Sequence, residues 1–143
     1  YFFNIKFMVK IAPSILAADL LKIENEVINV DNAGAEYIHI DVMDGHYVPN
    51  ISFGSNIVKT LRPITKKVLD VHLMISPVLP YIQEFINAGA DIISFHPEAD
   101  NNPQQIIKMI ESAGCPMPQK FTDYQPHSIG FFPYSFPLCY SPI

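Results

Sequence analysis

The sequence predicts an α/β protein in which the strands of a parallel sheet alternate with helices. One observation is that β-rich segments and segments with helical spacing of apolar residues follow one another through residues 8–114. The other is a repeated helix ending, because residues 32–38 and 87–93 are near copies in which a glycine precedes a β-rich run. About four βα units fit in this span, half of an eight-stranded barrel that typically takes ~250 residues.

A small doubly wound sheet stays open as the alternative fold. No Gly-x-Gly-x-x-Gly follows the first predicted strand, so a dinucleotide site is not expected.

The first three elements follow from local residue patterns. Residues 10–15 are a short β-rich run and predict a strand. Residues 19–33 predict a helix that ends at Gly34, because apolar residues recur at helical spacing: Leu20, Ile23, Val27 and Val30. Residues 37–43 have a β-rich, alternating pattern, which predicts the second strand.

The remaining elements repeat this order. Residues 56–61 predict a short helix closed by an Arg-Pro pair, and residues 68–75 predict the third strand. Residues 78–87 predict a helix that an Ala-Gly pair ends, and residues 91–95 predict the fourth strand. Residues 103–112 predict the last helix, which a second Ala-Gly pair ends.

Composition excludes several classes of protein. With 49% hydrophobic and 16% charged residues among 143, the chain is neither disordered nor collagen-like. The net charge is −5 and the nine basic residues do not cluster, so we expect neither a nucleic-acid nor a membrane partner. No apolar run reaches the roughly 18 residues of a spanning helix. Two cysteines without Cys-x-x-Cys spacing exclude a disulfide scaffold and a thiolate zinc site, and a cytoplasmic location fits best.

Polar side chains on two neighbouring strands carry the main functional prediction. His39 and Asp41 share one face of one predicted strand, and Asp70 and His72 share one face of the next. Burying such groups is costly unless they are paired or bind a metal. The set His39, Asp41 and His72 suits zinc, iron, manganese or cobalt, so we predict a metal or catalytic site there. A histidine that only bonds its neighbours is the structural alternative for any one of them.

Other polar residues and methionines receive more ordinary interpretations from pattern alone. Ser14 contacts a ligand or caps the helix that follows, and its position does not decide between the two. Met43 and Met74 are more often core residues than substrate contacts. His46 lies in a turn-rich loop and is as often merely exposed as functional, whereas for His96 we expect capping or packing rather than a place lining the site.

Both ends of the chain differ in character from its middle. Residues 1–7 precede the first methionine and do not form a signal peptide, and we interpret them as lying upstream of an initiator at Met8, with a genuine edge segment as the alternative. From residue 116 onward the chain holds 6 of the 13 prolines and 7 of the 17 aromatic residues, with two charged residues. Dense proline forbids helices and weakens strands, so we interpret this segment as an out-of-frame or read-through tail, with a proline-rich recognition tail as the alternative.

Four segments together resemble the ribulose-phosphate 3-epimerase family. They are IAPSILAAD at 11–19, HIDVMDGHYVPNISFG at 39–54, LDVHLM at 69–74 and GADIISFH at 89–96. The long middle motif is the most specific of the four. The resemblance runs from about Val9 to Gly114, roughly three-quarters of the chain.

The resemblance implies a TIM (β/α)8 barrel of which this chain carries about four βα units. It implies an isomerase of the pentose phosphate pathway that interconverts D-ribulose 5-phosphate and D-xylulose 5-phosphate with one divalent metal ion. By resemblance the metal ligands are His39, Asp41 and His72, and Asp41 is also one of two acid/base carboxylates. The substrate-binding residues implied in the same way are Ser14, His39, His72, Met43 and Met74, the two methionines forming an apolar wall.

The sequence also departs from the family. The family's fourth ligand and second acid/base is an aspartate in an Asp-Gly-Gly stretch, and glycine-rich loops hold the phosphate; this sequence contains neither. We therefore expect residues 8–114 to be the first half of such a barrel, inactive alone and marginally stable, with 1–7 and 115–143 outside the family fold.

Other functions stay open. One is an epimerase of another ketose phosphate such as D-allulose 6-phosphate. Others are a non-catalytic metal-binding fragment or a sequence with no folded product. We expect a small-molecule sugar phosphate as the partner, and a homo-oligomer is possible.

Overall fold

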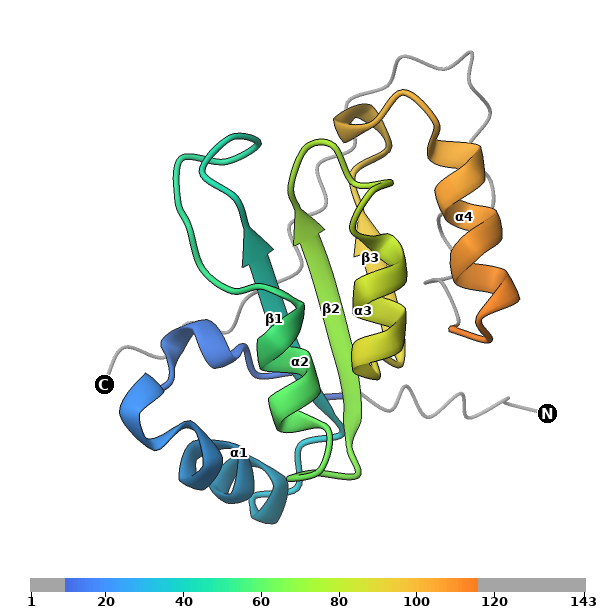
Figure 1. The fold of residues 1–143 in the computed structure, drawn as a ribbon. Coiled ribbons are helices and arrows are strands. Elements are labelled where there is room, and N and C mark those ends of the chain that lie inside the picture. Colours follow the sequence, from blue (N-terminus) through green and yellow to red (C-terminus); the bar gives the residue numbers. More distant parts are fainter. Residues whose placement is uncertain (1–9, 116–143) are drawn as a thin grey trace, which may run out of the picture.

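A computed structural model describes residues 10–115 of the chain, and within them helices follow strands in regular alternation (Figure 1). The atypical ends predicted at residues 1–7 and 115–143 lie outside the described residues, except for Cys115, which is buried and belongs to the core cluster. The α-helices are α1 (Ile23–Asn32), α2 (Ser55–Leu61), α3 (Ile82–Ala88) and α4 (Pro103–Ser112). The strands are β1 (Tyr37–Met43), β2 (Val68–Met74) and β3 (Ile92–Phe95). Short 3-10 turns are η1 (Ile15–Ala17), η2 (Leu20–Lys22) and η3 (Pro97–Ala99).

The three strands form one parallel sheet in the order β1-β2-β3, and their arrows point the same way in Figure 1. The register aligns Tyr37 with Val68 at the start of β1 and β2, and Asp70 with Ile92 between β2 and β3. The predicted alternation of strands and helices, with a parallel sheet, is therefore confirmed for the described part of the chain.

One face of the sheet carries the apolar core. Burial alternates strictly along β1 and β2, so every second side chain is buried. The helices α2 and α3 lie across this face in Figure 1, and buried residues such as Val58 of α2 and Phe85 of α3 belong to the same core cluster as the strand residues. The buried strand residues are Ile38, Ile40, Val42, Leu69, Val71, Leu73, Ile93 and Phe95. Their burial leaves the other face of the sheet to the half-buried polar side chains.

The two near-identical helix endings adopt the same cap. At the end of α1 the Ala35 amide bonds to the Val30 carbonyl at 3.3 Å, and Gly34 has φ +94°. At the end of α3 the Ala90 amide bonds to the Phe85 carbonyl at 3.3 Å. This is the Schellman pattern, in which a residue with positive φ ends the helix and is usually glycine.

The predicted strand at residues 10–15 is wrong. Backbone pairing with β1 is limited to an isolated bridge between Ser14 and His39, and η1 begins at Ile15. The next bridge toward the amino end would need two hydrogen bonds between this segment and Tyr37. The first is present, because the Ile11 carbonyl accepts the Tyr37 amide at 3.2 Å. In a parallel ladder of this register the amide of residue 13 completes that bridge, but Pro13 has no N–H to donate.

Two helices begin later than predicted. The helix expected from residue 19 starts as η2, because the Asp19 carboxylate accepts the Leu21 amide and Lys22 leaves the helical region at φ −129°. The helix expected from residue 78 starts at Ile82. Here Asp100, which is distant in sequence, accepts the amides of residues 78 and 79 at 2.9 and 2.8 Å and holds them outside the helix.

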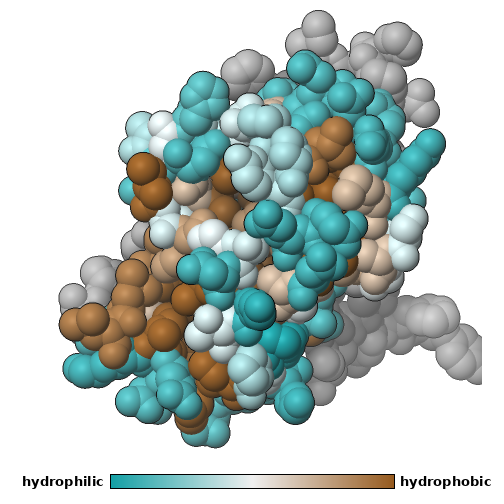
Figure 2. Space-filling model, viewed as in Figure 1, coloured by the Kyte–Doolittle hydropathy of each residue, from teal (hydrophilic) through white to brown (hydrophobic). Residues whose placement is uncertain are grey.

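Apolar side chains are exposed near the amino-terminal turns. Figure 2 shows them as brown atoms at the lower left, where η1, η2 and α1 lie in Figure 1. The exposed large apolar residues of these elements are Leu16, Leu20, Leu21 and Ile28. Among residues 10–115, no helix combines the length and apolar composition needed to cross a bilayer.

Candidate metal centre

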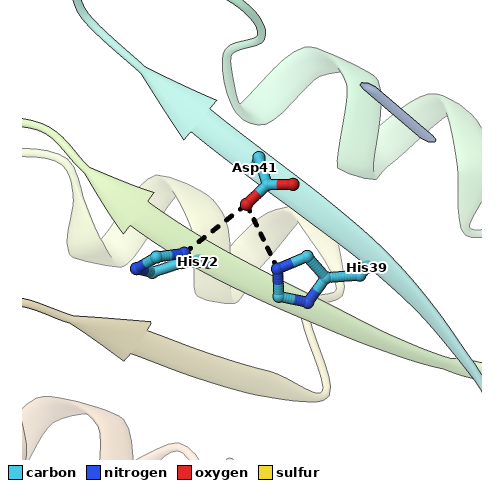
Figure 3. A group of neighbouring side chains, drawn as sticks. All are labelled: His39, Asp41 and His72. Carbon is cyan, nitrogen blue, oxygen red and sulfur yellow. Dashed lines mark hydrogen bonds and ion pairs between the residues drawn. The ribbon is translucent and has the colours of Figure 1, made fainter. Parts of the chain in front are cut away.

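The candidate site lies on the polar face of β1 and β2. The parallel register aligns Asp41 with His72 and His39 with Asp70, so two polar pairs lie side by side on neighbouring strands. Their side chains are 14–27% exposed, which leaves them reachable but largely desolvated. In Figure 3 the rings of His39 and His72 both lie next to the Asp41 carboxylate.

Asp41 is the centre of this group. Its Oδ2 accepts a hydrogen bond from the Ser14 hydroxyl at 2.5 Å, and its Oδ1 lies 3.2 Å from His39 Nε2 and 3.5 Å from His72 Nδ1. Burial alone would raise the pKa of Asp41, but the hydrogen bonds from His39, His72 and Ser14 outweigh it and hold the pKa well below its usual range. Asp41 is therefore an ionised carboxylate over the whole physiological pH range.

His39 lies between two carboxylates. Its Nδ1 is 2.8 Å from Asp70 Oδ2, and its Nε2 faces Asp41. Burial alone would lower the pKa of His39, but the bonds to Asp41 and Asp70 and their negative charges outweigh it and raise the pKa to about 9. A cation, either a proton or a metal ion, is thus electrostatically favoured between these groups.

A second polar chain leads away from His72. Its Nε2 is 3.0 Å from His96 Nε2, and the His96 ring stacks against Tyr47 with centroids 5.1 Å apart. Tyr47 donates its hydroxyl proton to Glu98 at 2.8 Å. Burial and this hydrogen bond raise the pKa of Tyr47 to about 12, so it stays a donor at neutral pH. Burial and the neighbouring His72 ring lower the pKa of His96.

The loop after β1 is held in place by its own polar residues. The Ser52 hydroxyl donates to the Asp41 carbonyl at 2.5 Å and accepts the Met43 amide at 2.9 Å. Asp44 accepts three backbone amides at 2.8 Å, those of His46, Tyr47 and Ser76. The carboxyl ends of β1 and β2 are thereby tied together beside the candidate site.

The donor set fits a divalent cation. One ligand atom from each of His39, Asp41 and His72 lies within 4.8 Å of the others, and all three residues are half-buried. Two imidazoles and one carboxylate form a set that binds zinc, iron, manganese and cobalt, and three protein ligands leave a position open for substrate. The geometry is consistent with the family of metals predicted from the sequence and does not select among them.

The other predicted residues lie around this group. Ser14 both accepts the Leu16 amide at 3.2 Å, capping η1, and donates to Asp41. Met43 and Met74 are aligned with each other, two residues beyond the Asp41–His72 pair on the same face. His46, for which a functional role stayed open, is exposed.

Sequence reasoning missed several contacts around the site. Capping, one of the two roles expected for His96, is wrong, because its side chain makes no cap bond; the ring instead packs against Tyr47 and contacts His72. The sequence places Asp70 on the correct face of its strand but does not indicate its bond to His39. Nothing local pointed to Glu98 or Ser52, whose partners depend on how the loops fold.

Comparisons with known proteins agree with the sequence motifs. The sequence model described as "Ribulose-phosphate 3 epimerase family" matches residues 10–127. A protein of Bacillus subtilis named ribulose-phosphate 3-epimerase is 51% identical over 107 residues, which are 75% of this chain and 49% of that protein. Proteins of the same name from Synechocystis and Chlamydia trachomatis are 47% and 43% identical over 80% and 92% of this chain, or 54% and 55% of their own lengths. The chain thus spans about half the length of the curated relatives it matches.

Proposed function

This chain belongs to the ribulose-phosphate 3-epimerase family, and we propose that residues 8–114 form the half of a (β/α)8 barrel that carries its metal-binding residues. In this proposal the complete protein interconverts D-ribulose 5-phosphate and D-xylulose 5-phosphate. The observation that carries the proposal is the approach of His39, Asp41 and His72 to within 4.8 Å on neighbouring parallel strands.

Asp41 acts as one of the two acid/base carboxylates. Inversion at carbon 3 requires a proton to leave from one face and a proton to return on the other, so one carboxylate is needed on each face. Asp41 is ionised, because hydrogen bonds from three neighbours hold its pKa low, and an ionised carboxylate can accept a proton. Its bond from Ser14 fixes the Oδ2 atom and leaves Oδ1 on the side of the two histidines.

His39 and His72 hold the metal together with Asp41. A divalent ion bound there would supply Lewis-acid chemistry toward the substrate carbonyl and the negative charge that develops beside it. The desolvated position of the three side chains supports this role, because electrostatic interactions are stronger away from bulk water.

Ser14, His39, His72, Met43 and Met74 are the substrate-binding residues of this proposal. The two methionines are half-buried and adjacent in the register, one layer beyond Asp41 and His72. A soft thioether surface lets a planar, electron-rich reaction intermediate pack against it without adding charge.

The printed chain contains no Asp-Gly-Gly stretch for the second acid/base. We therefore expect these 143 residues alone to bind metal without turning over substrate. We also expect a cytoplasmic location, a small-molecule sugar phosphate as partner, and possible self-association.

A chimera tests the catalytic assignment. Residues 8–114 of this chain replace the matching segment of the Bacillus subtilis relative, and epimerase activity is measured with D-ribulose 5-phosphate. We expect activity near that of the parent enzyme, and a loss of at least 100-fold for Asp41→Asn in the chimera, the size of effect typical of a general acid/base. Glu24→Gln in the same chimera is the matched control, since Glu24 is exposed on α1.

The alternatives give different results in the same assay. Preferred turnover of D-allulose 6-phosphate by the chimera, with the parent preferring the pentose, indicates that this half selects another ketose phosphate. A folded chimera that binds metal but turns over neither sugar contradicts the catalytic proposal and favours a metal-binding fragment.

A further inference from the structure

Each candidate metal-binding histidine contacts a partner through its second ring nitrogen, Asp70 of β2 for His39 and His96 directly after β3 for His72. His39 turns Nε2 to Asp41 at 3.2 Å and Nδ1 to Asp70 at 2.8 Å. His72 does the reverse, with Nδ1 3.5 Å from Asp41 and Nε2 3.0 Å from His96. The two rings therefore present different nitrogens to the same carboxylate.

We propose that Asp70 and His96 are positioning residues that fix opposite tautomers of the two metal-binding histidines. His39 then binds the metal through Nε2, and His72 binds it through Nδ1. This inference rests on the metal centre of the proposed function and adds to it which nitrogen each ring uses and what enforces the choice.

Asp70 selects the His39 tautomer by accepting its Nδ1 proton. A carboxylate has acceptor sites alone, so the nitrogen that faces it must carry the proton. Asp70 and His39 are aligned across β1 and β2, and both side chains are 21% exposed, so neither has much freedom to turn away. By the same rule Nε2 carries a proton toward Asp41 in the metal-free chain, and a metal ion bound beside Asp41 takes the place of that proton while Asp70 keeps the one on Nδ1. Such a carboxylate partner sets ring orientation and ligand basicity in metal sites.

His96 selects the His72 tautomer in the same way. Contact between two Nε2 atoms at 3.0 Å needs the proton on one of them. The His96 Nδ1 atom lies 3.6 Å from Glu98 Oε1, so the Glu98 charge favours the His96 proton on Nδ1 and leaves Nε2 as an acceptor. His72 then donates from Nε2, and its Nδ1 lone pair is available for a metal.

Tyr47 holds this second chain in place. Its ring stacks on His96 with an interplanar angle of 35°, and its hydroxyl donates to the same Glu98 oxygen that faces His96. Tyr47 lies in the loop after β1, and Glu98 lies in η3 after β3. The series of side-chain contacts from Tyr47 through Glu98 and His96 therefore connects the two outer strands of the described sheet around His72.

Nitrogen NMR of the full chain tests the inference directly. The protein is labelled with ¹⁵N at its five histidines, loaded with zinc, and studied by long-range ¹H–¹⁵N correlation. We expect a zinc-shifted Nε2 with a protonated Nδ1 for His39, and a zinc-shifted Nδ1 with a protonated Nε2 for His72. Zinc on the same type of nitrogen in both rings overturns the inference and leaves the proposed function standing.

Zinc affinity in variants provides the second measurement. Removing a residue that orients a metal ligand typically costs 10–100-fold in metal affinity. We expect losses of that size for Asp70→Asn and His96→Gln, measured by competition with a chelator. The matched controls Glu24→Gln and His46→Gln change exposed residues and are expected to bind zinc as the parent chain does. Parent-like affinity in both site variants contradicts the inference.

The same experiments separate failure of this inference from failure of the proposed function. If the parent chain binds no zinc, the metal centre itself is refuted and the inference falls with it. If zinc binds and the controls behave as expected, the tautomers of the parent chain decide the question even where a variant fails to fold. A variant that folds should also lose the single tautomer that its partner enforced, which a purely structural role would not produce.

Discussion

The Arg62 guanidinium is the cross-link on which we expect the stability of the described fold to depend most. It donates to the carbonyls of Thr65 and Lys67 at 2.7 and 2.9 Å and to Asp91 Oδ2 at 2.6 Å. The same Asp91 oxygen accepts the Leu69 amide at 2.8 Å. Because Leu69 lies in β2 and Asp91 directly precedes β3, this cluster fixes the start of the strand register on which the candidate metal centre depends.

The Arg62→Met substitution removes these bonds and keeps most of the apolar stem. A hydrogen bond to a charged group contributes roughly 1.5–3 kcal/mol where its partner stays dry, and an exposed ion pair at most about 1 kcal/mol. The Asp91 side chain is 46% exposed, so water replaces much of the ion pair. Thr65 is 3% exposed, so water cannot readily replace the hydrogen bond that its carbonyl accepts from Arg62. We expect Arg62→Met to lower the free energy of unfolding by about 2–4 kcal/mol, a large part of the roughly 5–15 kcal/mol typical of domains.

Urea denaturation followed by far-ultraviolet circular dichroism measures this loss, with a chelator present to exclude metal binding. Lys59→Met on α2 is the matched control, because Lys59 is exposed and its loss should change the stability by less than about 0.5 kcal/mol. Asp91→Asn keeps an oxygen for the Leu69 amide and should cost about 1 kcal/mol or less. A stability of Arg62→Met within about 0.5 kcal/mol of the parent would refute the reasoning.

Three further predictions concern the loops around the strands. Gly45→Ala should lower the free energy of unfolding by about 1–3 kcal/mol, because Gly45 has φ +74° and an added Cβ would lie 2.8 Å from Ile51 Cγ1. Gly34→Ala is the control, since Gly34 has φ +94° but nothing within 4 Å of an added Cβ, and calorimetry should show a smaller loss of stability for it. Equal losses for the two variants would contradict the contribution of the Ile51 contact. Burial alone would raise the pKa of Asp44, but hydrogen bonds from backbone amides outweigh it and lower the pKa below the ordinary 3.8. The ionised Asp44 carboxylate therefore stabilises the fold fully above pH 3.8, and this stabilisation is lost as the pH falls through the lower pKa of the folded state. Acid unfolding of Asp44→Asn should therefore depend less on pH below 3.8, and an unchanged profile would argue against this assignment. Ser14→Ala should weaken zinc affinity roughly tenfold by freeing the central carboxylate, whereas Ser14→Thr should retain it, and parent-like affinity of the alanine variant would count against the role of this hydroxyl.

The strands could be predicted from the sequence because their signal is local. The strand predicted at residues 37–43 has the bounds of β1, and the one predicted at 68–75 extends one residue past β2; burial alternates strictly along both. The same period places His39 and Asp41 on one side, and parallel pairing aligns them with β2, so their approach to His72 could also be foreseen. The roles of these residues in binding metal stay predictions.

The remaining features depend on contacts between distant residues. Asp100 sets the start of α3 by accepting amides 22 and 21 residues earlier, and no local pattern near Ile82 records this. His96 reaches His72 because β3 lies next to β2 and the chain continues in the same direction beyond the strand.

The missing ladder at residues 10–15 could have been foreseen, since Pro13 lacks the donor that a second bridge requires.

Metal binding by the parent chain tests the central claim most directly. The full chain is titrated with cobalt(II), and the visible absorption of the bound ion gives the stoichiometry and the nature of its ligands. The account predicts one ion per chain with nitrogen and oxygen ligands, and at least a 100-fold weaker affinity for Asp41→Asn, beyond the 10–100-fold cost of losing an outer partner. A parent chain that binds no ion, or an Asp41→Asn variant that binds as tightly as the parent, would contradict it.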